Sequence, residues 1–230
     1  MEIMARKTMA PTIVDLNNQG IVLLRVSNVD EAIACFTEAL GCTRKLAHSH
    51  YKGQKVNEGS LQEFPQSLMT RTLVVESLGA RDLTLLPHEH FNIYERAFVL
   101  GNDFEPLAEC ALSIAILFYN LAFAYHCKGT GQAIQQALRY YKLGLKVIRD
   151  SLPSPANVDL LLVTLAILNN MGHVFSLLTH FHDSATCAER IHFLLESSIP
   201  TFLARQDEEF SHFMEFYLEQ NDPLATAAAA

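Results

Sequence analysis

Hydrophobic residues recur with helical spacing along residues 112–148, and this stretch organises the prediction for the whole chain. Over residues 112–127 apolar side chains occupy almost every side of a predicted helix, so that helix must be covered by several neighbours. After a short break at residues 128–131 (KGTG), apolar residues recur every three or four positions and leave polar ones for solvent. The pattern predicts two antiparallel helices joined by a tight turn.

The same order of residue types occurs three times along the chain. Each copy has an asparagine, a longer residue, a small residue and, three positions further, a bulky apolar residue. Small residues permit two helices to approach closely, and the bulky residue fills the adjacent gap. We therefore expect the small residues to mark contacts between paired helices. The copies are Asn18-Gln19-Gly20 with Leu23, Asn120-Leu121-Ala122 with Tyr125, and Asn170-Met171-Gly172 with Phe175.

A second helix with its own pattern of small and bulky residues follows the first two copies. It is clearest in residues 30–40 (DEAIACFTEAL). Together the two patterns resemble the tetratricopeptide repeat, a helical hairpin of about 34 residues. The resemblance implies an all-α fold, a right-handed superhelix of antiparallel helical hairpins, with repeats at about residues 12–46, 112–148 and 160–196 of one domain, 1–230. The third copy departs from the pattern, because Ser184 and Ala188 stand where an alanine and an aromatic residue belong.

The motif asparagines are spaced more widely than the family's repeat length, which indicates a divergent member with elongated repeats and an insertion at about residues 47–105. We predict this insertion to be irregular and partly extended, because residues 70–85 and 91–100 contain β-compatible apolar residues. Residues 1–11 are predicted to be a loose tail. Beyond a break at Ile199-Pro200, a helix at about residues 202–219 is expected to cap the open end of the stack.

Composition narrows the choice of partners and compartment. The chain has 230 residues and a net charge of −8, so it lacks the cationic surface that nucleic-acid binding requires. Its five cysteines form no CxxC pair, which is typical of a reducing compartment, and no secretory signal is evident. We predict a cytoplasmic or nuclear protein without a membrane span, since the apolar run at residues 111–125 is short and its aromatics fit a repeat core.

Candidate chemistry is sparse. Three HxH pairs suggest a metal site, but no HExxH or Cys/His finger spacing accompanies them. His126 and Cys127 are adjacent, and neighbours on a helix diverge by about 100°. The KGTG sequence lacks the earlier glycine of a phosphate-binding loop. We therefore expect no cofactor, no metal and no enzymatic activity. The HxH pairs are His48 with His50, His88 with His90, and His180 with His182.

A protein surface remains as the functional feature. The resemblance implies that the first helices of the hairpins line an inner groove that binds a protein or peptide partner, so the chain is predicted to be a non-enzymatic adaptor or scaffold. The alternatives are a structural subunit of a larger complex and a metal-dependent enzyme. The net charge suggests a partner with basic character. The predicted partner-binding stripe is Asn17, Ile21, Arg25, Tyr119, Phe123, His126, Asn169, His173 and Ser176.

Overall fold

Three helical hairpins make up most of the described chain. The computed structural model describes residues 2–53, 74–77, 91, 93–101, 110–150, 158–205 and 210–214, and these are predominantly helical. The hairpins pair α1 (Glu2–Arg25) with α2 (Val29–Gly53), α3 (Cys110–Lys128) with α4 (Gly131–Asp150), and α5 (Val158–Leu177) with α6 (Phe181–Arg205). Residues 210–214 form a further short helical segment.

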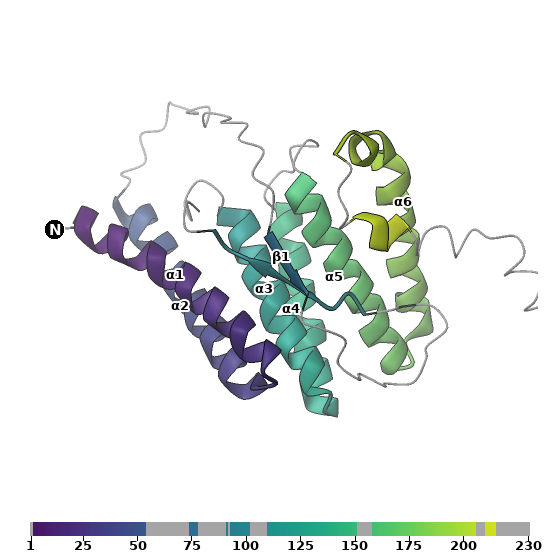
Figure 1. The fold of residues 1–230 in the computed structure, drawn as a ribbon, viewed down its shortest axis with the longest axis horizontal. Coiled ribbons are helices and arrows are strands. Elements are labelled where there is room, and N and C mark those ends of the chain that lie inside the picture. The colour runs from purple at the N-terminus through teal and green to yellow at the C-terminus, as the bar shows by residue number, and fades with distance from the viewer. Residues whose placement is uncertain are drawn as a thin grey trace, which may run out of the picture.

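The hairpins stand side by side in chain order. α2 packs against α3 and α4 against α5, so each hairpin contacts the next, as Figure 1 shows. Each hairpin turn contains one residue with left-handed backbone conformation, at Ser27, Gly129 and Thr179. The sequence between residues 128 and 131 is thus a helix-to-helix turn, in which the Thr130 hydroxyl accepts a hydrogen bond from the Ala133 amide at 3.3 Å.

The repeated small residues Gly20, Ala122 and Gly172 are buried, whereas of the repeated bulky residues Phe175 is buried and Leu23 and Tyr125 only partly so. Other aromatic residues fill the core. Phe36 of α2, Tyr119 of α3 and Tyr141 of α4 are fully buried. A methyl group at Gly20 would lie 2.6 Å from the Phe36 ring, so the predicted close approach between α1 and α2 is present. Contacts between hairpins are equally tight, since a methyl group at Gly144 of α4 would lie 2.9 Å from Ile167 of α5.

Part of the predicted insertion forms a two-stranded antiparallel ribbon. β1 (Val74–Ser77) pairs with β2 (Arg96–Val99), with Val74 opposite Val99 and Ser77 opposite Arg96. The ribbon lies across the face of α3 in Figure 1, and β2 contacts both α1 and α3. Extended structure is therefore present in the predicted insertion. The rest of the insertion, at residues 54–73, 78–90, 92 and 102–109, lies outside the described residues.

Three helix boundaries differ from those predicted. α2 continues to Gly53, so residues 47–53, predicted to begin the insertion, are helical. α1 already begins at Glu2, so residues 2–11 are helical, because their Met, Ala, Glu, Arg and Lys residues favour helix despite Pro11. α6 continues through Pro200 to Arg205, since a proline removes one hydrogen bond and bends a helix without necessarily ending it. Of the predicted capping helix, residues 206–209 and 215–219 lie outside the described part.

Within the described part of the chain, two helices are long and apolar enough to cross a membrane, at residues 111–128 and 158–177. Both are mostly buried within the stack of hairpins. Core helices of soluble proteins have the same length and composition, so these properties alone do not assign either helix to a membrane.

Candidate functional site

The three motif asparagines lie on one face of the hairpin stack and hold a segment of the same chain. Asn18 comes from α1, Asn120 from α3 and Asn170 from α5, at equivalent places in the three copies. The segment that they hold comprises residues 91 and 93–101, which include β2, and is called the strap below. It passes from α5 across α3 to α1, opposite to the order of the hairpins along the chain.

Each of these asparagines binds both polar groups of one strap residue. The Asn170 amide donates to the Tyr94 carbonyl at 3.1 Å and accepts from the Tyr94 N–H at 2.8 Å. Asn120 makes the same pair with Phe98, at 2.8 and 3.1 Å, and Asn18 makes it with Leu100, at 2.9 and 3.2 Å. A side-chain amide has one donor side and one acceptor side, so it matches a peptide group in both roles.

Further hydrogen bonds support the three asparagines, because Asn17 bonds to both Asn18 and Asn120, and Tyr119 bonds to Asn170. Asn17 donates to the Phe98 carbonyl at 3.1 Å and accepts from Asn120 at 2.9 Å. The Tyr119 hydroxyl accepts from Asn170 at 3.1 Å and lies 2.9 Å from the Arg96 carbonyl, to which it can donate. Burial raises the pKa of Tyr119 well above its usual value, so the hydroxyl keeps its proton and remains a donor.

The aromatic side chains of the strap pack against the helices, in addition to the hydrogen bonds of its backbone. A methyl group at Gly172 would overlap the ring of Phe91, so this glycine makes room for the strap. Phe98 packs edge-on against Tyr119, with ring centroids 4.9 Å apart, and Tyr94 lies 5.0 Å from Phe213. The strap's aromatic residues thus belong to the core of the protein.

The predicted partner-binding stripe is mostly buried in this structure. Arg25 alone of the nine residues is exposed, and the other eight have at most 4% of their surface accessible. Asn17 and Tyr119 contact the strap, whereas Asn169 donates to Asn170 at 3.2 Å. Ile21 and Phe123 are core residues. Ser176 is hydrogen-bonded to Ser184, whose hydroxyl donates to the Gly172 carbonyl at 3.1 Å.

His126 and His173 form a buried imidazole pair between α3 and α5. His126 Nε2 lies 3.1 Å from His173 Nδ1, and His126 Nδ1 lies 3.4 Å from the Tyr141 hydroxyl. One ring must donate while the other accepts, which requires an uncharged acceptor ring. Burial, and secondarily the His173 imidazole, lower the pKa of His126 from 6.5 to about 3, so the ring is neutral at pH 7.

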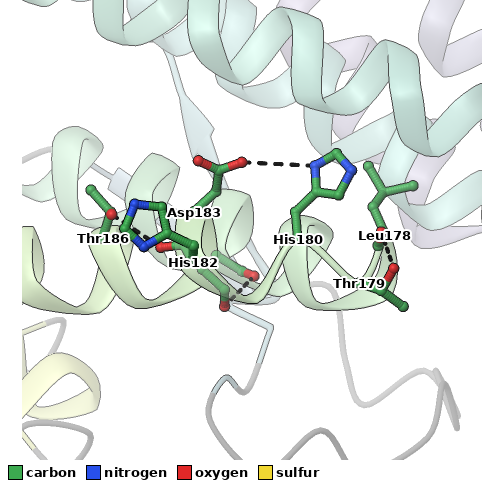
Figure 2. Close-up of polar contacts among 8 residues, drawn as sticks. Leu178, Thr179, His180, His182, Asp183 and Thr186 are labelled. Atoms are coloured by element: carbon green, nitrogen blue, oxygen red, sulfur yellow. Dashed lines mark hydrogen bonds and ion pairs between the residues drawn. The ribbon is translucent and has the colours of Figure 1, made fainter.

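The other candidate chemical residues that the structure describes form no shared site. Figure 2 shows the His180 ring turned toward Asp183, at an Nδ1–Oδ2 distance of 3.8 Å, on the exposed turn before α6. Among the described residues no group of three or more His, Cys, Asp or Glu side chains is placed to hold a metal. His88 and His90 lie outside the described residues, as do the side chains of His48 and His50. Lys128 pairs with Asp30 at 2.6 Å.

The sequence pointed to the asparagines but not to their partner. Recurrence of Asn18, Asn120 and Asn170 at one register was visible, yet the predicted stripe took the neighbouring Asn17 and Asn169. The strap itself was visible only as a short apolar stretch. Its contacts with α1 and α5 join residues about eighty positions apart, and the hydrophobic pattern carries no record of such pairing.

Comparison with known proteins leaves the geometry as the main guide to function. No family model matches the chain, and neither a curated protein nor a solved structure matches it.

Proposed function

We propose that this protein is a non-enzymatic adaptor whose tetratricopeptide-like stack of hairpins binds an extended segment of a protein partner. The supporting observation is the row of Asn18, Asn120 and Asn170, each of which pairs with both polar groups of one backbone residue. Such contacts recognise extended backbone without requiring a particular charge, as in other modes of peptide recognition. The proposal includes neither cofactor nor metal and places the protein in the cytoplasm or nucleus.

The strap defines what a partner segment must offer. Tyr94, Phe98 and Leu100 each have at most 2% of their surface accessible to solvent. Burying each such side chain stabilises the fold by about 1.5–3 kcal/mol. A partner that replaces the strap must therefore bring large apolar residues at matching places and an extended backbone between them.

Competition between the strap and a synthetic copy of it tests the proposal. The full chain carrying Phe98→Ala has a weakened strap, and a peptide with the sequence of residues 91–101 restores the missing ring in trans. We expect this peptide to raise the melting temperature of the variant with increasing concentration, because a ligand that binds only the folded state stabilises it. The wild-type chain, whose strap is intact, should respond much less.

A peptide with alanine at the position of Phe98 provides the control, because it retains the backbone and loses the ring. If both peptides gave the same melting temperature, the row of asparagines would not be the binding site for the native peptide. The proposal would likewise be refuted if the native peptide left the melting temperature of the variant unchanged at every concentration. A second variant, Asn120→Leu combined with Phe98→Ala, should lose the response to the native peptide if the amide row reads the backbone.

A structural subunit is the second candidate. The observation that favours it is the complete burial of the strap, together with large apolar side chains left on the surface, such as Val26 at 68% and Phe193 at 70% exposure. Solution behaviour separates the two: an adaptor should be monomeric on its own, whereas an obligate subunit should aggregate or co-purify with its partners. Stoichiometric zinc or iron in the purified chain would instead favour a metal-dependent enzyme.

A further inference from the structure

The surface of the last two hairpins has an open groove. It encloses about 890 Å³ between α4 and α6, with α5 as its floor. The α5 residues that line it, such as Leu168, Met171 and Phe175, project from a different side of that helix than Asn170, which holds the strap. This groove is therefore independent of the proposed function.

The α5 floor of the groove is apolar but almost fully buried, since Leu168, Met171 and Phe175 have only 2–6% of their surface accessible, so the accessible apolar surface lies on the walls. Leu194 lines the groove together with Phe193, whose side chain is among the most exposed large apolar groups described. Lys142 lies over the Phe175 ring, 5.2 Å from its centroid. An apolar surface recessed between two helices fits the apolar side of a third helix, as in other helix-in-groove complexes.

The α4 wall is basic although the whole chain carries −8. Arg139, Lys142, Lys146 and Arg149 are exposed and recur three or four residues apart, so they form one stripe along the helix. Arg149 pairs with its neighbour Asp150 at 3.3 Å, whereas no ion pair is recorded for Lys142 or Lys146 within the described part of the chain. Across the groove, α6 contributes Arg190 and the carboxylates Asp183 and Glu189.

The length of the basic stripe sets the size of the occupant. The groove meets a shallower one along α4 that begins at Gln135 and shares Lys142 and Lys146 with it. From Gln135 to Arg149 the helix rises by roughly 20 Å, which is about four turns. A flat membrane surface would reach the stripe but would not fill the space of about 890 Å³ between α4 and α6, so a helix suits both features better than a bilayer does.

From these features we propose that the groove between α4 and α6 is a docking site for an acidic amphipathic helix of a partner protein. Its apolar side would lie above the buried floor, against Leu145, Phe193 and Leu194, and its carboxylates would face Lys142 and Lys146. Complementary charge of this kind accelerates association and selects the partner, while burial of the exposed Phe193 ring and its apolar neighbours provides most of the affinity.

The probe is a dye-labelled synthetic helix of about four turns, with leucines along one side and glutamates flanking them; its matched control has lysine at every glutamate position. Fluorescence anisotropy with the full chain should show binding of the acidic helix, weakened by added salt, and little binding of the basic one. Lys142→Glu with Lys146→Glu should weaken binding of the acidic helix about ten-fold or more. Both side chains are exposed, so the fold should survive the change.

Arg44→Glu with Lys45→Glu on α2 makes the same change in net charge at an exposed place away from the groove and should leave binding unchanged. Equal weakening by both pairs of substitutions would show only general attraction and would overturn the proposal. So would failure of the acidic helix to bind while vesicles containing phosphatidylserine bind through Lys142 and Lys146, which would indicate a membrane surface. Loss of self-association in the Lys142→Glu, Lys146→Glu chain, without any binding of the probe helix, would assign the groove to a second copy.

Discussion

Gly172 and Gly20 occupy the same place in their repeats but make room for different neighbours. The sequence predicted that both lie between paired helices. A side chain at Gly20 would meet Phe36 of the paired helix, whereas one at Gly172 would meet Phe91 of the strap. The pattern identified a close approach in each case, but it did not identify the partner at Gly172, because Phe91 belongs to a segment without repeat periodicity.

Gly172→Ala should therefore destabilise the protein by about 1–3 kcal/mol through overpacking. Gly41→Ala on α2, where a methyl group would meet nothing within 4 Å, should instead stabilise it by about 0.5–1 kcal/mol. Urea unfolding measures both changes. Adding Phe91→Ala should recover part of the loss caused by Gly172→Ala and none of that caused by Gly20→Ala; equal recovery in both would place Phe91 elsewhere.

Burial of His126 makes the free energy of unfolding depend on pH. In the folded chain the pKa of His126 is about 3, against about 6.5 unfolded, so between these values the unfolded chain binds more protons. The contribution is fully present above pH 6.5 and is lost progressively as the pH falls toward 3. The free energy of unfolding therefore falls by about 2 kcal/mol between pH 7.5 and pH 5.

Urea unfolding of His126→Gln at those two pH values checks this expectation. The glutamine amide can still bond His173 but does not titrate, so the variant should lose about 2 kcal/mol less than the wild type between pH 7.5 and pH 5. His180→Gln, on the exposed turn before α6, is the control and should follow the wild type. A wild type and a His126→Gln chain with the same dependence on pH would mean that His126 is not buried in its neutral form.

At the scale of single elements, the strap is an extended segment whose backbone is satisfied mainly by side chains. Each asparagine serves one strap residue, so removing one should loosen the strap locally before the helices respond. Asn120→Leu leaves the Phe98 N–H without its acceptor, while the Phe98 carbonyl keeps its bond from Asn17. We expect a loss of about 1–3 kcal/mol, the cost of an unsatisfied buried group.

Hydrogen exchange of individual strap amides measures this effect. In Asn120→Leu the Phe98 amide should exchange faster than in the wild type by a larger factor than the amides of Tyr94 and Leu100, which keep Asn170 and Asn18. Gln135→Leu on the exposed side of α4 is the control. Uniform acceleration along the whole strap would show that the three anchors release together.

Elements with strong periodicity were predictable from the sequence, and the strap was not. The α3–α4 hairpin and its turn were predicted from residues 112–148, because apolar residues recur there with helical spacing on both sides of a short polar break. The predicted break at Pro200 was wrong, because α6 tolerates the proline and continues to Arg205. Extended structure at residues 96–99 was expected, but its location against α1 and α3 depends on contacts between distant residues, such as the bond from Asn17 to Phe98, which no local pattern encodes.

At the scale of the whole molecule, the strap changes how the three hairpins depend on one another. In a linear stack each repeat contacts only its neighbours, so terminal hairpins can unfold separately. Here one segment is bonded to the first hairpin at Asn18, the second at Asn120 and the third at Asn170. Loss of any hairpin should therefore expose the strap and weaken the others.

This coupling predicts a single cooperative unfolding transition for the wild-type chain. Circular dichroism and tyrosine fluorescence should give the same urea midpoint; the chain contains no tryptophan, so tyrosine reports on the core. Replacing the two end anchors, Asn18→Leu with Asn170→Leu, should separate the transitions or lower the slope with urea, because at the outer hairpins the strap then keeps only the Asn17 bond to the first and the packing of Phe91 on the third. Asn28→Leu with Gln135→Leu, outside the strap contacts, should keep one transition. If the anchor variant unfolds as cooperatively as the wild type and only at lower urea, the helix interfaces alone couple the hairpins and the strap merely adds stability.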